Sequence, residues 1–181
     1  CSNDKLPNKI LLSGEKGIGK STLAYHLVNF ILSQDEEFSY DLENLQINSA
    51  NKSFKLLQNK SNPNFILVDV NEEKKMIDIN QVRSLILDLN KSSFNNKNRL
   101  VLIDNIELLN INAVNALLKI LEEPNDNINF ILVNNNKRIL PTLKSRCLNF
   151  KIQLNTNQVF DVTNKILKDN YTNLINEEIL N

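Results

Sequence analysis

The residues of this chain most able to do chemistry form a glycine-rich segment near its start. Residues 14 to 21 read Gly-Glu-Lys-Gly-Ile-Gly-Lys-Ser, which matches the pattern G-x-x-x-x-G-K-[ST] at every fixed position. Glycine lets the backbone fold closely around phosphate, so that amide N–H groups point inward at the positive end of a helix. The segment predicts a site for a nucleoside triphosphate, and its expected binding residues are Gly14, Gly17, Ile18, Gly19, Lys20, Ser21 and Thr22.

Three of these residues have distinct expected roles. We expect the ammonium group of Lys20 to bridge the β- and γ-phosphates and the hydroxyl of Ser21 to be a ligand of Mg²⁺. Thr22 is expected near the α-phosphate. The alternative, a glycine-rich turn that matches by chance, is disfavoured because a strand pattern precedes the segment and a helix pattern follows it. The predicted ligands are therefore ATP and Mg²⁺.

A second group of polar residues follows the apolar run Leu100–Ile103. Asp104 is expected to hold Mg²⁺ through its water ligands, because a carboxylate at the end of a neighbouring strand has that role in such sites. An efficient ATPase of this class has Glu at the next position, where the carboxylate orients the attacking water, but this chain has Asn105. We expect nucleotide binding with slow or absent hydrolysis, and Asn105→Glu to raise turnover if the other groups are in place. Glu107 lies past the strand end and is interpreted as a surface residue.

The elements that must position these residues alternate along the chain. Short apolar runs predict strands, and apolar stripes with three- and four-residue spacing predict amphipathic helices. The expected strands are 10–13, 65–70, 100–103, 130–133 and 148–152, and the expected helices are 23–31, 79–89 and 111–122, the last ended by Pro124. The polar, Asn-rich stretch 35–63 is expected to hold a helix flanked by loops. This alternation predicts an α/β fold with a parallel sheet covered on both faces.

Composition limits what the chain can be. It has 181 residues, of which 41% are hydrophobic and 23% charged, and this is typical of a soluble globular domain. The 21 basic residues equal the 21 acidic ones, so no overall field draws the chain to nucleic acid or to a membrane, and its apolar runs are too short to span one. The only cysteines, Cys1 and Cys147, exclude a disulfide framework and a cysteine-based zinc cluster, which favours the cytoplasm.

The two ends of the chain bear on its domain organisation. A new helical pattern begins after Thr156, so we expect a nucleotide-binding domain over 1–155 and the beginning of a truncated helical domain over 156–181. The chain opens on Cys1 rather than Met, which indicates either a piece of a longer protein or a mature lipoprotein. We favour the piece, because no signal segment is visible and the expected chemistry is intracellular.

Two blocks late in the chain resemble a known family. Residues 115–124 match N-A-L-L-K-x-L-E-E-P and residues 140–147 match L-P-x-x-x-S-R-C, the signatures of the AAA+ clamp-loader ATPase subunits. The resemblance covers about residues 8 to 155. It implies an AAA+ P-loop domain with a five-stranded parallel sheet flanked by helices, and it implies that 156–181 begins a small helical lid domain.

The resemblance also implies roles for individual residues. Arg146 resembles the family's arginine finger, which acts in trans on nucleotide bound by a neighbouring subunit, and the alternative is a structural arginine at a helix end. Asn134 and Asn135 fall where the family has its polar sensor of the γ-phosphate, and the spacing leaves the choice between them open. Cys147 is interpreted as a small buried hydrophobic residue rather than a reactive thiol.

Within the family, the chain resembles the delta-prime type of bacterial DNA polymerase III subunit. Asn105 replaces the glutamate of the motor subunits, and Ser61-Asn62-Pro63-Asn64 resembles the S-H-P-D of some delta-prime chains. The implied partners are other clamp-loader subunits, the sliding clamp and primed DNA, without a membrane. Zinc is not expected, since no cysteine stands where many members have a four-cysteine module. The alternatives are a tau/gamma-type motor subunit and a P-loop kinase, and the kinase is disfavoured because no Arg-rich lid is visible.

Overall fold

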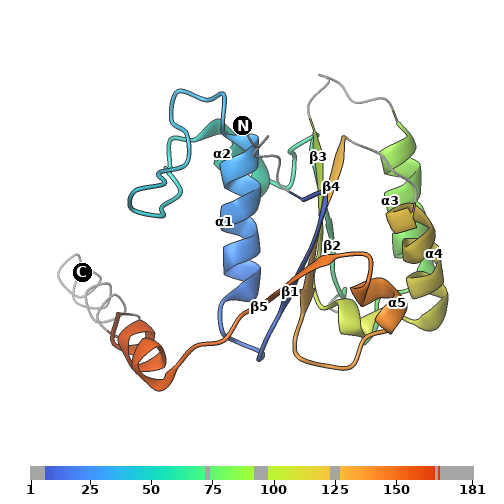
Figure 1. The fold of residues 1–181 in the computed structure, drawn as a ribbon. Helices are drawn as coiled ribbons and strands as arrows, with labels where there is room; N and C mark the ends of the chain where they lie inside the picture. Colours follow the sequence, from blue (N-terminus) through green and yellow to red (C-terminus); the bar gives the residue numbers. More distant parts are fainter. Residues whose placement is uncertain (1–6, 72–73, 92–97, 123–126, 166, 168–181) are drawn as a thin grey trace, which may run out of the picture.

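The computed structural model describes residues 7–71, 74–91, 98–122, 127–165 and 167. A single sheet of five parallel strands lies at the centre, in the order β2-β3-β4-β1-β5 (Figure 1). The strands are β1 Lys9–Ser13, β2 Phe65–Val68, β3 Arg99–Ile103, β4 Ile128–Asn134 and β5 Leu148–Lys151. The predicted α/β fold with a five-stranded parallel sheet is confirmed.

Helices cover both faces of this sheet (Figure 1). The helices α1 Lys20–Leu32 and α2 Lys52–Gln58 lie on one side, and α3 Ile79–Asn90, α4 Ile111–Glu122 and α5 Pro141–Lys144 lie on the other. Because strand side chains alternate, Leu11 packs into the core under α3 and α4, whereas Ile10 and Leu12 pack into the core under α1. The two cores hold the carboxyl ends of β1, β3 and β4 side by side.

The central strands β3 and β4 are buried along their whole length. This burial explains their continuous apolar runs, since a central parallel strand is covered on both faces. The one charged residue of β3, Arg99, donates hydrogen bonds to the carbonyl oxygens of Asp88 (2.6 Å), Leu89 (3.1 Å) and Lys91 (2.5 Å) at the end of α3. The Arg99 guanidinium therefore supplies hydrogen bonds to carbonyl oxygens at the C-terminal end of α3, and its positive charge is favourable at that end of the helix.

The start of α3 follows the sequence pattern closely. Asp78 Oδ1 accepts hydrogen bonds from the backbone N–H groups of Asn80 (2.9 Å) and Gln81 (3.2 Å), and Gln81 Oε1 accepts one from Asp78 N (3.1 Å). This reciprocal capping box satisfies amides that have no partner inside the helix. Helix α4 spans 111–122 as predicted, and Pro124, expected to end it, lies outside the described residues.

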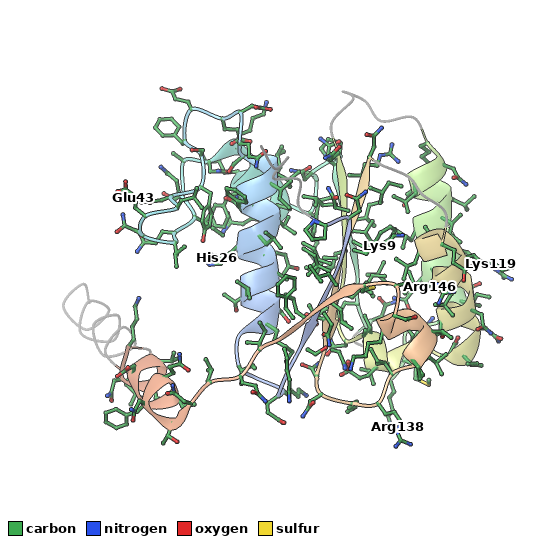
Figure 2. All side chains as sticks on the ribbon, viewed as in Figure 1. Lys9, His26, Glu43, Lys119, Arg138 and Arg146 are labelled. Carbon is green, nitrogen blue, oxygen red and sulfur yellow. The ribbon has the colours of Figure 1, made fainter. Side chains whose placement is uncertain are left out.

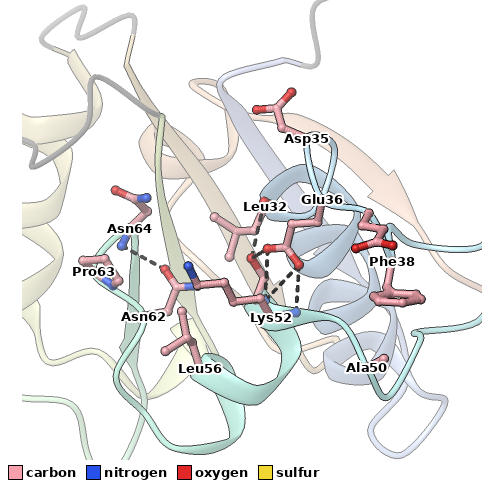
Figure 3. Close-up of a pocket in the computed structure, with 12 residues that line it drawn as sticks. Leu32, Asp35, Glu36, Phe38, Ala50, Lys52, Leu56, Asn62, Pro63 and Asn64 are labelled. Carbon is pink, nitrogen blue, oxygen red and sulfur yellow. Dashed lines mark hydrogen bonds between the residues drawn. The ribbon is translucent and has the colours of Figure 1, made fainter.

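The polar stretch between α1 and β2 holds one short helix, α2, as predicted. The carboxylate of Glu36 accepts hydrogen bonds from Lys52 N (2.8 Å), Ser53 N (3.1 Å) and Ser53 Oγ (2.5 Å), and so caps the start of α2 (Figure 3). Asn29 of α1 donates to Asn51 Oδ1 (3.2 Å), and both of these residues are fully buried. A polar network therefore anchors this segment to α1, beside an open pocket of about 550 Å³.

The last described part of the chain is the most exposed. Alternation predicted a half-buried fifth strand through residue 152, but β5 ends at Lys151, with Leu148 50% and Phe150 45% exposed, because β5 is an edge strand. Residues 156–165 are helical, as expected, and the assignment of 156–181 to a second domain stays a prediction. Among the described residues, no helix has both the length and the apolar character needed to cross a membrane.

Candidate nucleotide-binding site

The glycine-rich loop joins the end of β1 to the start of α1, as predicted. Gly17 and Gly19 have φ angles of 87° and 86°, which L-residues with side chains rarely adopt. Gly14 is required for a different reason, because a Cβ there would overlap the carbonyl oxygen of Ile152. The loop is therefore tied to the segment that follows β5, and Ile152 N also donates to Ser13 O (2.7 Å).

Helix α1 begins without a side-chain cap. Its N-cap residue, Gly19, offers no side-chain hydrogen bond, and its first turn contains no acidic residue. The first amide N–H groups of a helix have no partner within the helix and carry its positive partial charge. This 13-residue helix therefore presents uncapped amides at the loop, as a phosphate site requires.

Lys20 supplies the cation of the site. Its side chain is only 3% exposed, and Nζ donates a hydrogen bond to the carbonyl oxygen of Glu15 (2.5 Å). Burial lowers the pKa of Lys20, and the carboxylates of Asp104, Glu107 and Glu15 oppose that shift. Carboxylates of the segment after β3 thus act on a lysine that is turned toward its own loop.

The acidic edge of the site is built from the ends of β2 and β3. Asp69 follows β2, and Asp104 and Asn105 follow β3. Asn105 N donates to Asp104 Oδ1 (2.8 Å), and Asn105 Nδ2 donates to Asp69 Oδ1 (2.8 Å). Gln81, from the α3 capping box, donates through Nε2 to Asp69 O (2.8 Å). The position expected to orient water therefore holds an amide that is bound to a neighbouring carboxylate.

Glu107 belongs to this site, so its interpretation as a surface residue is wrong. The 3₁₀ turn Ile106–Leu108 folds the chain back after β3, and Glu107 is partly buried at the sheet edge. Its Oε1 accepts from Asn135 Nδ2 (3.0 Å) and its Oε2 accepts from Asn135 N (3.2 Å). Sequence patterns carry no signal for this contact, because it depends on the path of the turn.

The two candidate sensor residues point in different directions. Asn135 Nδ2 also donates to Asn105 Oδ1 (2.7 Å), so this side chain lies against the acidic edge. Asn134 Nδ2 donates instead to Lys137 O (3.1 Å), and its buried Oδ1 has no hydrogen-bond partner among the described residues. Asn134 is the last residue of β4 and Asn135 follows the strand, where the chain turns away from the sheet, so the two side chains have different partners.

Arg146 lies apart from the loop. Its Nη1 donates to Thr142 O (2.6 Å), and its Nη2 forms an ion pair with the carboxylate of Glu122 at the end of α4. Figure 2 shows Arg146 beside α4 and α5, on the side of the sheet opposite α1. Its side chain remains 31% exposed, at an outer face of the molecule.

The side chains of His26 and Cys147 have other surroundings. His26 Nδ1 lies 2.9 Å from the hydroxyl of Tyr40, away from the loop. Cys147 is partly buried against the core beneath α4, and burial raises the pKa of its thiol to about 11. A thiol held protonated at neutral pH is a poor nucleophile.

A pocket of about 610 Å³ adjoins the glycine-rich loop. Its lining is mostly apolar and amide residues, with two charged residues, Glu15 and Lys151, beside them; the apolar ones are Ile18, Ile152, Leu154 and Val159, and the amides include Gln153, Asn155 and Gln158. Apolar walls with a few amide groups suit a flat heterocycle that carries donors and acceptors. The arrangement can therefore hold phosphates at the loop and a base beside it.

The chain matches the family model described as "DNA polymerase III, delta subunit" over residues 1–156. The DNA polymerase III subunit delta' of Pseudomonas aeruginosa is 34% identical over 139 residues, which are 76% of this chain and 40% of that protein. The DNA polymerase III subunit gamma of Buchnera aphidicola subsp. Schizaphis graminum is 29% identical over 178 residues, which are 97% of this chain and 46% of that protein. The chain thus spans less than half the length of these two relatives.

Among solved structures, a DNA polymerase III gamma subunit-related protein from Thermotoga maritima is similar to this chain. Its TM-score is 0.49 at 22% identity, and the match covers 82% of this chain and 42% of that chain.

Proposed function

Because this chain belongs to the DNA polymerase III delta subunit family, we propose that it is a delta-prime-type clamp-loader subunit that binds ATP. In this proposal it works in the bacterial cytoplasm with other clamp-loader subunits, and together they place the sliding clamp on primed DNA. The observation that carries the proposal is the loop of residues 14–21, with Lys20 buried opposite Asp104.

The residues present fit a magnesium ion. Ser21 stands at the start of α1, and Asp104 lies at the end of β3, where the only hydrogen bond its carboxylate accepts among the described residues comes from Asn105 N. We propose that these two side chains hold Mg²⁺, Ser21 directly and Asp104 through water. When bound, the ion would neutralise phosphate charge, and the uncapped amides of α1 would hold the phosphate oxygens.

Weak hydrolysis is part of the proposal, and the hydrogen bonds of Asn105 support it. The side-chain NH₂ of Asn105 is bound to Asp69 and its oxygen to Asn135, so the amide is engaged on both sides. An amide also cannot take up a proton from water. A motor subunit of the tau/gamma type is the second candidate, since a gamma subunit is among the relatives, but Asn105 disfavours it.

Two further roles belong to the proposal. Asn135 is favoured over Asn134 as the sensor of the γ-phosphate, because Asn135 contacts Asn105 and Glu107 whereas Asn134 is bonded to Lys137. Arg146 is proposed to act on nucleotide in a neighbouring subunit. Its partial exposure on an outer face and its distance in the fold from α1 support this role.

Reconstitution tests the proposed function. The full-length protein is mixed with the partner clamp-loader subunits, the clamp and primed DNA, and clamp loading is followed by fluorescence. We expect that omission of this subunit abolishes loading and that its addition restores it. Equal loading without the subunit would contradict the assignment.

A further inference from the structure

The hydrogen-bond donors of Asn135 are all in use. This residue has three N–H bonds, two on Nδ2 and one on the backbone nitrogen. Nδ2 donates to Asn105 Oδ1 at 2.7 Å and to Glu107 Oε1 at 3.0 Å, and the backbone N donates to Glu107 Oε2 at 3.2 Å. One carboxylate therefore holds both the backbone and the side chain of the proposed sensor.

This arrangement conflicts with direct contact to a phosphate. A side-chain amide can bind a phosphate oxygen only through N–H, because its own oxygen is an acceptor and repels the anion. With both Nδ2 donors engaged, the remaining polar group of the Asn135 side chain is Oδ1. A γ-phosphate must therefore displace Glu107 or Asn105 to bind this side chain.

Glu107 is the partner that a phosphate competes with most directly. A phosphate oxygen and the Glu107 carboxylate are both anionic, so they repel each other when both lie at the same amide group, whereas the neutral oxygen of Asn105 is not repelled. Glu107 is also one of the carboxylates whose charge acts on Lys20. In the site without nucleotide, Glu107 therefore interacts with two groups that the phosphates of ATP would bind.

We propose that Glu107 is a positioning residue that holds Asn135 until a γ-phosphate displaces it, and that it thereby sets the preference of the site for ATP over ADP. The inference rests on the proposed nucleotide-binding function. ATP has to break the Glu107–Asn135 side-chain contact, whereas ADP has no γ-phosphate and leaves the contact in place. Glu107 thus weakens the binding of ATP but not that of ADP. Loss of its carboxylate should therefore increase the preference of the site for ATP over ADP.

The experiment measures the affinities of the full-length protein for MgATP and MgADP by calorimetry. For Glu107→Ala we expect the ratio of ATP to ADP affinity to rise about tenfold, the size expected for one charge-assisted hydrogen bond. Glu107→Gln keeps an acceptor oxygen without the charge, so it should raise the ratio less. If Glu107→Ala does not fold, Glu107→Gln still has to raise the ratio.

Two controls distinguish the loss of the Glu107–Asn135 contact from the loss of a negative charge that acts on Lys20. In an Asn135→Ala background, Glu107→Ala should leave the ratio unchanged, because no sensor side chain remains to be released. Glu15→Ala removes a carboxylate that also acts on Lys20 but does not contact Asn135, so it should strengthen ATP and ADP binding alike. An unchanged ratio in Glu107→Ala, or an equal rise without Asn135, would overturn this inference alone. A wild-type protein that binds neither nucleotide would overturn the proposed function as well.

Discussion

Asn105 donates a hydrogen bond through Nδ2 to Asp69 Oδ1, at 2.8 Å, across the carboxyl ends of β3 and β2. The backbone of Asn105 is left-handed, with φ 55° and ψ 47°, a conformation that asparagine tolerates better than most residues. The left-handed backbone of residue 105 and the neighbouring carboxylate of Asp69 therefore both favour an asparagine at this position.

Asn105→Glu should lower the free energy of unfolding by about 1–3 kcal/mol, because glutamate is strained in this backbone conformation and its charge would face Asp69. The sequence favoured a rise in turnover for this variant, but the contact with Asp69 changes that prediction: turnover should stay near background, since repulsion by Asp69 displaces the new carboxylate. Urea denaturation and a phosphate-release assay measure the two effects. The double variant Asp69→Asn/Asn105→Glu restores an amide–carboxylate pair and should recover only the part of the stability lost to charge repulsion, because the backbone strain remains. A stable single variant with brisk hydrolysis would show that the other groups are already in place.

Lys20→Ala should abolish detectable binding of MgATP. It removes the buried cation of the loop, and no other group inside the loop carries a full positive charge toward the phosphates. Calorimetry with the full-length protein measures the affinity. Lys16→Ala is the matched control, because Lys16 lies in the same loop but is exposed, and it should bind nearly as the wild type does. Equal affinities in wild type and Lys20→Ala would refute the assigned site.

Arg146→Ala should leave the subunit's own ATP affinity unchanged and slow ATP turnover by the assembled complex. A guanidinium that acts in trans stabilises charge in the transition state, and its loss costs up to about a thousandfold in other phosphoryl-transfer systems. Lys144→Ala removes an exposed cation from α5 and serves as the control. An assembled Arg146→Ala complex that hydrolyses ATP and loads clamps at the wild-type rate would leave Arg146 with a structural role only.

Glu122→Ala should change the free energy of unfolding by less than about 1 kcal/mol, because its ion pair with Arg146 is partly exposed. It should nevertheless lower turnover in the assembled complex, since the guanidinium loses a contact that orients it. Thermal melts and the same turnover assay measure both quantities. A large loss of stability would indicate that the pair is mainly structural.

Gly14→Ala should destabilise the protein by about 1–3 kcal/mol, because its methyl group would overlap the backbone carbonyl of Ile152, which cannot move as a side chain can. Nucleotide affinity should fall as well, since relief of the overlap shifts the loop. Urea denaturation and calorimetry are the measurements. Gly17→Ala is a useful comparison because a Cβ there meets no atom within 4 Å, so its cost should come from backbone strain alone. A wild-type stability for Gly14→Ala would mean that the two segments are not tightly joined.

Cys147 should react slowly with iodoacetamide at pH 7.5. Burial raises the pKa of its thiol to about 11, so below that pH the protonated form dominates and the reactive thiolate is scarce. The rate should rise as the pH approaches 11. Mass spectrometry of the labelled peptide gives the rate at this residue, and the same protein in urea is the control, because the exposed thiol should react faster at equal pH. Fast labelling of the folded protein would contradict the assigned burial.

The amino-acid sequence was sufficient to predict the elements whose signals are local. The loop of residues 14–21 was identified from its own spacing, and the runs before Asp69 and Asp104 were identified as strands from continuous apolar residues. Each of these features depends on the backbone conformation and burial of a few consecutive residues. Both properties are strongly biased by the types of those residues.

The contacts between side chains of distant segments could be found only in the folded structure. Glu107 and Asn135 lie 28 positions apart in the sequence, and their contact requires the turn after β3 to fold back toward the end of β4. Asn134 and Asn135 are identical in type, so only their different hydrogen-bond partners at the end of β4 distinguish them. The close approach of Gly14 to Ile152 likewise joins two distant segments. Such contacts depend on how strands register and turns fold in three dimensions, and this information is not carried by any short stretch of residues.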